Sequence, residues 1–406
     1  MRPVRKIVLV ADTFPPLRTS GAVQLRDLSR EFVRQEFNLT VLLPFPDQPD
    51  GCKKEIIEGV TVVRLRTPRT KDVGYIRRTL AEFAMPFLML RQLRRSPFGR
   101  ERWDGVVWYS PSIFHGPLVK VLKALSDCKS YLIIRDIFPE WAVDMGLMGR
   151  GFPYRFFDAV ARYQYSVADI IGVQTPGNMV YFKHWAKKDG RNLEVLPNWL
   201  GDPSKAECSI QVSDTGLRGR KVFVYAGNMG VAQGMDILLD LAEGLHDRDD
   251  IGFLFVGRGM DANRLCDSAK ARRLSNVEFF DEIDPDEIPS LYAQCSAGIV
   301  ALAPEHKSHN IPGKFLTYMQ SGLPVLANIN AGNDMANTVR AEQVGQVCES
   351  NQVSELLRLA KKLLMQIETD KGLPTRCKAL FEREFAVEKA VKQIVAALAD
   401  DKVSKT

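Results

Sequence analysis

The sequence has few of the side chains that bind metals and no long apolar stretch. Only five of its 406 residues are histidines, and its seven cysteines are scattered, without a CxxC pair or a histidine at metal-ligand spacing. This argues against a metal site and favours free thiols in a reducing compartment. No apolar run approaches the roughly 18 to 20 residues needed to span a bilayer. The first strand-like run is apolar for only five residues before Asp12, too short for a signal peptide core, so we expect a cytoplasmic protein.

Charge is divided unevenly along a chain whose length and composition suit two soluble globular domains. Hydrophobic residues make up 45% of it and charged residues 26%, and the net charge is +6. Residues 1–200 hold 31 Lys and Arg against 20 Asp and Glu, whereas residues 201–406 hold 24 against 29. The basic surplus therefore belongs to the first half alone. The basic first half carries no motif that reads nucleic-acid bases, and the second half is acidic. Nucleic acid is therefore not an expected partner.

The basic surplus is greatest on both sides of the apolar run 83–90. The residues there are Arg77, Arg78, Arg91, Arg94, Arg95, Arg100 and Arg102. Basic flanks around an apolar face suit a protein that rests on an anionic leaflet. We expect Arg91, Arg94 and Arg95 to contact the inner face of the cell membrane. A core helix with a solvated arginine face is the alternative.

Strand-like and helical segments alternate along the whole chain, which predicts an α/β protein with parallel sheets. In the first half the expected strands are 6–11, 39–43, 60–65, 105–109, 131–135, 169–173 and 193–196, and the helices include 23–35, 117–125, 154–167 and 178–185. After a polar stretch the expected strands are 221–226, 252–256, 277–280, 298–302 and 324–327, with helices near 235–245, 263–274, 286–294 and 313–321. Two doubly wound Rossmann-like domains, 1–198 and 199–384, are expected, with their strand ends facing a shared cleft.

The most informative stretch is 310–326, Asn-Ile-Pro-Gly-Lys-Phe-Leu-Thr-Tyr-Met-Gln-Ser-Gly-Leu-Pro-Val-Leu. It predicts a loop, a helix that opens at Pro312 and stops at Gly322, and then a buried strand. The N-terminus of a helix presents free N–H groups and the positive end of its dipole, so Gly313 and Lys314 are candidates to bind a diphosphate. We expect the Lys314 side chain to face solvent, and a plain βα unit with a solvated lysine is the alternative.

Two further glycine-containing loops follow expected strands in the second half. The segment 222–234 reads Val-Phe-Val-Tyr-Ala-Gly-Asn-Met-Gly-Val-Ala-Gln-Gly, and 253–259 reads Phe-Leu-Phe-Val-Gly-Arg-Gly. Glycines between a strand and a helix let the backbone approach a phosphate closely. Arg258 could bind phosphate with both guanidinium arms, or be a solvated loop arginine.

Together these segments resemble GT-B glycosyltransferases of the family 4 type, which use nucleotide sugars in bacterial surface polysaccharide assembly. Residues 312–325 are similar to the family wording PxK…YMxxGxPV, 225–234 to YxGNxGxxQG, and 253–259 to FVGxG. The resemblance covers essentially the whole second domain. It implies a GT-B fold and a donor site that includes the following residues: Gly227, Asn228, Gly230, Gln233, Arg258, Gly313, Lys314 and Thr317.

Thr317 is a departure from that pattern. The family usually has a glutamate there that accepts both ribose hydroxyls, and the matching earlier acidic position is His309. A neutral threonine cannot chelate a diol as a carboxylate does. Either the donor sits differently, Glu305 substitutes from the preceding loop, or affinity is lower.

In the first domain, the loop 12–22 resembles a PPxxxxG loop that the family lays against the donor diphosphate. Gly21 is the residue we assign to that role, with Ser20 as the expected N-cap of the next helix and Arg18 as a further cationic contact. A tight turn without a ligand is the alternative.

Two polar clusters follow later strands of the first domain. His115, in the segment 112–117, is either a ligand of the donor sugar or an ordinary turn histidine. Residues 135–141, Arg-Asp-Ile-Phe-Pro-Glu-Trp, resemble the RDxWPE signature of amino-sugar transferases in O-antigen pathways, which are of the fucosamine type. Asp136 and Glu140 could accept the proton of the acceptor hydroxyl, or simply pair with Arg135.

These features lead to one main functional hypothesis. We expect a retaining transferase that moves a sugar, an N-acetylated amino sugar, from UDP to a polyprenyl-diphosphate-linked oligosaccharide in lipopolysaccharide O-antigen or related synthesis. Cations and helix N-termini can neutralise the leaving diphosphate, so no metal or other cofactor is expected. A UDP-sugar 2-epimerase and a catalytically silent GT-B partner subunit are the alternatives. The resemblance also implies that a C-terminal helix, about 385–400, crosses back onto the first domain.

Overall fold

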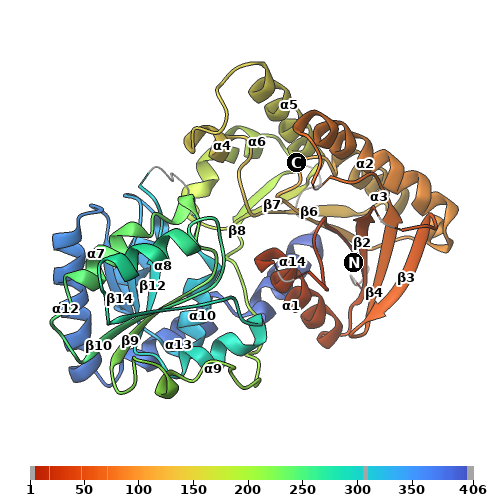
Figure 1. The fold of residues 1–406 in the computed structure, drawn as a ribbon. Helices are drawn as coiled ribbons and strands as arrows, with labels where there is room; N and C mark the ends of the chain where they lie inside the picture. Colours follow the sequence, from red (N-terminus) through yellow and green to blue (C-terminus); the bar gives the residue numbers. More distant parts are fainter. Residues whose placement is uncertain (1–4, 18, 47, 71, 305–309, 400–406) are drawn as a thin grey trace. The chain divides into compact units, whose positions relative to one another are not determined.

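A computed structural model describes residues 5–17, 19–46, 48–70, 72–304 and 310–399 of the chain. It divides into two compact units (Figure 1). Unit 1 comprises Met1–Gly201 with Val387–Thr406, and unit 2 comprises Asp202–Ala386. Each unit holds its own sheet with helices on both faces. The expected α/β architecture with two parallel-sheet domains is confirmed.

The sheet of unit 1 has eight strands in the order β3-β4-β2-β1-β5-β6-β7-β8. The strands are β1 (Lys6–Val10), β2 (Asn38–Phe45), β3 (Cys52–Ile57), β4 (Val60–Arg66), β5 (Gly105–Tyr109), β6 (Lys129–Ile134), β7 (Ile170–Val173) and β8 (Asn192–Val195). All neighbours are parallel except β3, which pairs antiparallel with β4 at the edge. The sequence analysis did not predict β3, because Lys53, Lys54 and Glu55 give it the polar composition of a loop.

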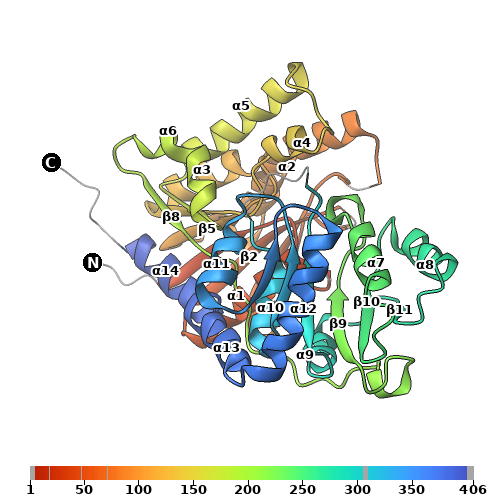
Figure 2. The ribbon, with the colours of Figure 1, turned by 90° about the vertical axis from the view of Figure 1, so that its left-hand side faces the viewer.

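Helices cover both faces of this sheet. The helices of unit 1 are α1 (Ser20–Arg34), α2 (Tyr75–Arg95), α3 (Gly116–Ser126), α4 (Glu140–Asp144), α5 (Phe152–Val167), α6 (Lys183–Ala186) and α14 (Val387–Ala399), with the 3₁₀ segments η1 (Pro97–Arg100) and η2 (Pro176–Phe182). Leu28 of α1 and Ile394 of α14 are fully buried in one cluster with β1 and β5 side chains. Met89 of α2 and Leu118 of α3 are buried on the other face, and α5 packs beside α3 (Figure 2). The chain end thus completes the core of unit 1.

The sheet of unit 2 has six parallel strands in the order β11-β10-β9-β12-β13-β14. They are β9 (Lys221–Ala226), β10 (Ile251–Val256), β11 (Val277–Phe280), β12 (Ala297–Ala301), β13 (Val325–Asn328) and β14 (Gly345–Cys348). Figure 2 shows β9, β10 and β11 side by side. In chain order this is the Rossmann arrangement 3-2-1-4-5-6, whose strand order reverses between β9 and β12. Such a reversal is where doubly wound sheets bind ligands, so the loops after these two strands become the candidates.

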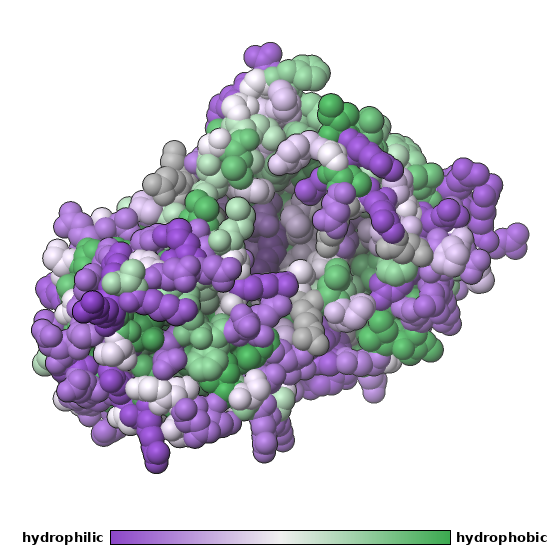
Figure 3. Space-filling model, in the orientation of Figure 1, coloured by the Kyte–Doolittle hydropathy of each residue, from purple (hydrophilic) through white to green (hydrophobic). Residues whose placement is uncertain are grey.

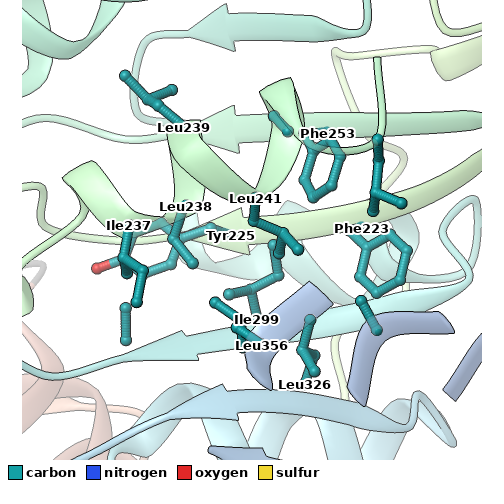
Figure 4. Packing of buried hydrophobic residues seen from close by; sticks show 14 of the residues in the cluster. Phe223, Tyr225, Ile237, Leu238, Leu239, Leu241, Phe253, Ile299, Leu326 and Leu356 are labelled. Carbon is teal, nitrogen blue, oxygen red and sulfur yellow. The ribbon is translucent and has the colours of Figure 1, made fainter. Parts of the chain in front are cut away.

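The core of unit 2 lies between its sheet and its helices. Its helices are α7 (Asp236–Glu243), α8 (Ala262–Ala271), α9 (Ile288–Tyr292), α10 (Gly313–Ser321), α11 (Asp334–Glu342), α12 (Val353–Thr369) and α13 (Leu373–Glu384), with 3₁₀ segments η3 (Val212–Asp214), η4 (Val231–Gln233) and η5 (Pro285–Glu287). Phe223 of β9 stacks on Phe253 of β10 at 5.4 Å between ring centroids. Leu241 of α7 and Leu356 of α12 belong to the same buried cluster (Figure 4). Truncating such a leucine to alanine costs about 2–5 kcal/mol.

Some local predictions differ from the structure. The helix expected at 178–185 is the 3₁₀ segment η2 followed by the short α6, and β14, α11, α12 and α13 were not predicted. Pro176 at the start of η2 fixes a turn, but the segment lacks the long apolar stripe that stabilises a full helix. In the described parts of the chain, no helix is both long and apolar enough to cross a membrane.

Candidate active site

The loop after β9 is built from backbone that only glycine can supply. Gly227 has a φ of +142°, and a Cβ placed on the neighbouring Gly257 would collide with the Gly227 carbonyl oxygen. The Gly227 N–H donates to Val256 O at 2.9 Å, and the Met229 N–H donates to Arg258 O at 2.7 Å. The loops after β9 and β10 therefore lie backbone to backbone. This contact positions both loops at the place where the phosphate of a ligand would approach.

Polar side chains hold the rest of this loop in one conformation. The Gln233 side-chain oxygen accepts from the Gly230 N–H at 3.1 Å and from the Asn228 amide at 3.2 Å. The Tyr225 hydroxyl, at the end of β9, donates to Asn228 O at 2.5 Å. Three of the predicted donor residues are thus brought together, and in the structure they support the loop itself.

Lys314 is the cation of this site, and its environment corrects our expectation that it faces solvent. Its ammonium Nζ lies 3.4 Å from the centroid of the Tyr225 ring, and Gly227 leaves just enough space beside it. A Cβ on Gly227 would sit 3.5 Å from that Nζ. Burial lowers the pKa of Lys314 to about 7. Among the described residues no carboxylate pairs with it, so its only electrostatic support is the aromatic face.

Helix α10 delivers Lys314 to that place. Pro312 is its N-cap and Gly313 its first residue, while Gly322 ends it in the left-handed conformation at φ +74°. Tyr318, one turn on, is fully buried and donates to the carbonyls of Val224 and Ile299 at 3.1 and 3.0 Å. These bonds tie α10 to β9 and β12, the two strands that flank the reversal of strand order.

The remaining predicted donor residues of unit 2 have other partners or lie outside the described residues. Arg258 is exposed and pairs with Glu282 at 3.0 Å, a carboxylate that would compete with a phosphate for its guanidinium. The Thr317 hydroxyl donates to Gly313 O at 3.4 Å and is half-buried on α10. Glu305 and His309, which were weighed against the family's acidic positions, lie outside the described residues.

Gly21 lies at the corresponding reversal in unit 1, between β1 and β5. A Cβ on Gly21 would meet the Thr13 methyl group at 3.2 Å and the Tyr109 hydroxyl at 3.5 Å, so a larger residue would press on the end of β5. The helix cap differs from our expectation. Thr19, not Ser20, is the N-cap of α1 and accepts from the Ala22 N–H at 3.3 Å, because Ser20 is already the first residue of the helix. Arg18 lies outside the described residues.

His115 follows β5 and caps α3, and only 1% of it is exposed. Burial lowers its pKa to about 4, so the imidazole is neutral at physiological pH. Neither ring nitrogen has a hydrogen-bond partner in the described part of the chain. A neutral imidazole has one donor and one acceptor, and leaving both unmade in the interior is costly. This histidine has the hydrogen-bonding capacity of a ligand-binding residue.

Asp136 stands at the carboxyl end of β6, next to Arg135. The Arg135 guanidinium donates to the Ser20 hydroxyl at 3.1 Å, which joins the end of β6 to the start of α1. Burial raises the pKa of Tyr109, and the charges of Arg135 and Asp136 act on the same phenol. Asp136 therefore belongs to the charged edge around the switch point of unit 1.

Glu140 does not pair with Arg135, the partner that the sequence suggested. It opens α4, accepts from the Tyr154 hydroxyl at 2.5 Å and pairs with Arg150 at 3.0 Å. That hydrogen bond raises the pKa of Tyr154 to about 12. Since Arg150 and not Arg135 is its partner, the carboxylate braces the start of α5 against α4. This arrangement favours a structural role over a proton acceptor.

Sequence reasoning missed Tyr225, the ring beneath the Lys314 ammonium. In the sequence it is one more aromatic residue of a buried strand, and nothing there shows that its face meets a cation. It also missed the buried polar chain at the strand ends of unit 1. Asn198 donates to Gln174 at 3.1 Å, and Gln174 donates to Arg135 O at 2.9 Å.

Within the described ranges no three His, Cys, Asp or Glu side chains gather as metal ligands would.

Comparison with known proteins agrees with this architecture. The profile of the family described as Glycosyl transferases group 1 matches residues 220–366. A protein of Escherichia coli (strain K12) named as a colanic acid biosynthesis glycosyl transferase, WcaI, is 24% identical over 62% of this chain and 62% of its own length. The Pseudomonas aeruginosa protein WbjE, named as a glycosyltransferase, is 23% identical over 82% of each chain.

Among solved structures, Anabaena HepE in complex with UDP-glucose has a TM-score of 0.67. It is 15% identical, and the match covers 97% of this chain and 99% of HepE. The structure of WaaG, a glycosyltransferase involved in lipopolysaccharide biosynthesis, matches with a TM-score of 0.65 at 15% identity, over 97% of this chain and 99% of WaaG. Residues 220–366 match the glycosyl transferases group 1 family, and the likeness to HepE and WaaG along nearly the whole chain shows that it has the GT-B fold.

Proposed function

We propose that this glycosyltransferase takes a sugar from a UDP-sugar and transfers it, with retention of configuration, to a polyprenyl-diphosphate-linked oligosaccharide. The transferred group is an N-acetylated amino sugar, and the product belongs to lipopolysaccharide O-antigen or a related surface polysaccharide. The name of WcaI refers to colanic acid biosynthesis, and the HepE crystal holds UDP-glucose, which supports this class of donor and pathway.

The observation that carries the proposal is the position of Lys314. Lys314 lies half-buried over the Tyr225 ring and against the Gly227 loop, with no paired carboxylate among the described residues, so an anion could pair with its ammonium. It stands in the first turn of α10, where the helix dipole adds to its attraction. A UDP diphosphate fits these features, and its binding would return Lys314 to the charged state.

Catalysis would not need a metal. As the bond between sugar and diphosphate breaks, negative charge grows on the leaving phosphate, and the Lys314 ammonium and the N–H groups at the start of α10 could stabilise it. In unit 1, neither ring nitrogen of His115 has a hydrogen-bond partner among the described residues, and one of them could bond to a sugar hydroxyl. Asp136, directly after β6, is the candidate to orient the acceptor hydroxyl or accept its proton, whereas Glu140 bonds to Arg150 and Tyr154 between α4 and α5.

A lipid-linked acceptor and a peripheral position at the inner membrane face are supported by the surface of unit 1. Four exposed apolar residues recur along one face of α2. They are Ile76, Leu80, Phe83 and Phe87, with exposed fractions of 80, 66, 49 and 52%. Hydrophobic residues are visible on the surface over α2 and α5 (Figure 3). The same helix face continues, at helical spacing, to the exposed Arg91 and Arg94. Apolar and basic residues on one helix face suit an anionic leaflet.

A transfer assay tests this function. Purified protein is incubated with UDP-N-acetylhexosamines and a polyprenyl-diphosphate-linked acceptor, with and without a chelator. We expect UDP release and an elongated lipid product in both cases, with the anomeric configuration of the donor retained. A 2-epimeric sugar nucleotide as the product would favour the epimerase, and UDP binding without any transfer would favour the silent subunit.

A further inference from the structure

A groove in unit 1 lies outside the strand ends described above. It is bordered by the edge strand β3, the C-terminal end of α2 and the 3₁₀ segment η1, and its volume is about 750 Å³. The lining residues that concern us are Lys54 of β3, Gln92 and Arg95 of α2, Phe98 of η1 and the flanking Glu101. Donor and acceptor chemistry, as derived above, uses none of them.

The charges in this groove are unbalanced. The Lys54 ammonium lies 5.9 Å from the centroid of the Phe98 ring, which holds the side chain over the groove. Within the described ranges, neither Lys54 nor Arg95 forms an ion pair with a carboxylate. Glu101 also lines the groove, but Lys6 already engages its carboxylate. Two cations thus line one hollow, and Glu101, the acidic residue among its described lining, is already paired with Lys6.

We infer that this groove binds the phosphate group of a phosphate ester. Lysine supplies a point charge and arginine a planar fork, and together they are a common pair of phosphate ligands. The Gln92 carboxamide, which lies in the same wall, adds a neutral hydrogen-bond donor. The volume falls within the range of about 300–1,000 Å³ that small-molecule sites occupy, which leaves space for the group esterified to the phosphate.

Two sources could supply such a phosphate, a phospholipid headgroup or a soluble phosphate ester. The position of the groove favours the headgroup. Helix α2 carries the exposed apolar face from Ile76 to Phe87 and ends at Arg95, so the lipid-facing residues and the groove share one helix. This preference for the headgroup rests on the proposed membrane contact, whereas the phosphate site itself does not.

The test compares two double variants with the same change of charge. Lys54→Gln with Arg95→Gln removes the groove cations. Lys53→Gln with Arg94→Gln removes their sequence neighbours, which do not line the groove; Lys53 instead pairs with Glu55. Calorimetric titrations with inorganic phosphate and with glycerol 3-phosphate are made in saturating UDP, so that the donor site is occupied. We expect binding at least tenfold weaker in the groove variant and unchanged in the control.

Vesicle binding separates the two sources. Co-sedimentation with phosphatidylglycerol vesicles, against neutral phosphatidylcholine vesicles, should fall further in the groove variant than in the control if the ligand is a headgroup. Equal loss in both variants, together with lost glycerol phosphate binding, assigns the groove to a soluble ester. Equal phosphate binding in wild type, groove variant and control overturns the proposal, and so does the absence of saturable binding to wild type.

Folding and catalysis are followed separately. The exchange of Lys54→Arg with Arg95→Lys should keep phosphate binding, and the melting temperatures of all variants should agree. UDP affinity and sugar transfer are measured on the same samples. If transfer fails in every sample while the groove and control variants still differ in phosphate binding, the proposed function has failed and the groove site stands.

Discussion

The carboxyl edges of the two sheets differ in whether backbone or side-chain groups form them. In unit 2 the edge consists of glycine backbone, with Gly227 and Gly257 in contact and a single lysine above them. In unit 1 the edge consists of side chains, among them the buried His115, Gln174 and Asn198. A backbone cradle suits a diphosphate, whose shape is the same in every nucleotide sugar. Side chains can be exchanged one at a time, which suits an acceptor that differs from enzyme to enzyme.

The surfaces of the two units differ as well. Unit 1 exposes an apolar face on α2 with arginines at its end, whereas the most exposed large hydrophobics of unit 2, Met260, Val231 and Met365, lie on separate elements. The sequence half that forms most of unit 1 is also the basic half. Membrane attraction is therefore expected of unit 1 alone, and nucleotide affinity chiefly of unit 2. Each variant below should affect a property of one unit and spare those of the other.

The largest effect is expected from Asp136→Asn. If the carboxylate accepts the proton of the acceptor hydroxyl, turnover on a lipid-linked acceptor should fall by about 10²–10⁴-fold, the usual contribution of such a group. UDP affinity should stay as in wild type, because Asp136 belongs to unit 1. Glu140→Gln is the control, and we expect it to lower the melting temperature through Arg150 and Tyr154 more than it lowers turnover. Full turnover of Asp136→Asn would remove this residue from the chemistry.

Lys314→Met should weaken UDP binding by about 1.5–3 kcal/mol, or roughly 10- to 150-fold, since a charge-assisted hydrogen bond to phosphate is lost. The same change should stabilise the fold at pH 7. Burial holds the pKa of Lys314 near 7, so between pH 7 and about 10.4 the unfolded chain binds more protons than the folded one. The sign of the linkage makes stability rise with pH across that window in wild type.

The Lys314→Met variant would not show that rise, because its methionine side chain carries no titratable group. Thermal unfolding at pH 7 and pH 9 measures the difference, with Lys361→Met on α12 as a surface control. A variant that loses stability at pH 7 while binding UDP normally would contradict both parts of the prediction.

Replacing Arg91 and Arg94 by Gln should release the protein from anionic vesicles. Each basic residue near such a surface contributes about 1 kcal/mol, so partitioning should fall roughly thirtyfold at low salt and less at high salt. UDP affinity measured by calorimetry should not change. Partitioning equal to that of wild type would assign these two arginines to an ordinary solvated helix face.

The smallest effect is expected from Thr317→Glu, which restores the glutamate that the family usually has. A carboxylate on α10 could accept ribose hydroxyls, and charged hydrogen bonds contribute about 1.5–3 kcal/mol before desolvation is subtracted. We expect UDP affinity to rise by up to about tenfold, and Thr317→Gln serves as the uncharged control. Weaker binding by a folded Thr317→Glu variant would mean that the pocket around Thr317 holds the nucleotide in another pose.

The sequence predicted the elements whose patterns are local. Strands β9 and β11 and helix α10 have the predicted bounds, and α14 lies within the predicted 385–400; in α10 an apolar period is combined with a clear stop at Gly322. Strand β3 was missed because its stability comes from pairing with β4, which is a contact that the period of a single segment does not contain.

The candidate site could be predicted only as a set of loops. The glycine motifs pointed to the strand ends of unit 2, but the environment of Lys314 depends on Tyr225, which is 89 residues away in the chain. From its position in the first turn of a helix, the Lys314 side chain was expected to face solvent. Tertiary packing places it over the Tyr225 ring instead. The same holds for Glu140, whose partners Arg150 and Tyr154 belong to the following loop and helix.

Burial in unit 2 lowers the pKa of Lys314 to about 7, and we expect a bound diphosphate to raise this pKa again. Calorimetry of UDP binding at pH 8, repeated in buffers of different ionisation enthalpy, measures the protons taken up directly. With a pKa near 7 in the free protein, we predict that binding takes up most of one proton at pH 8. Affinity should also fall about tenfold per pH unit above pH 7, and neither effect should occur in Lys314→Met. UDP binding without proton uptake, and with equal affinity at pH 7 and pH 9, would contradict the account.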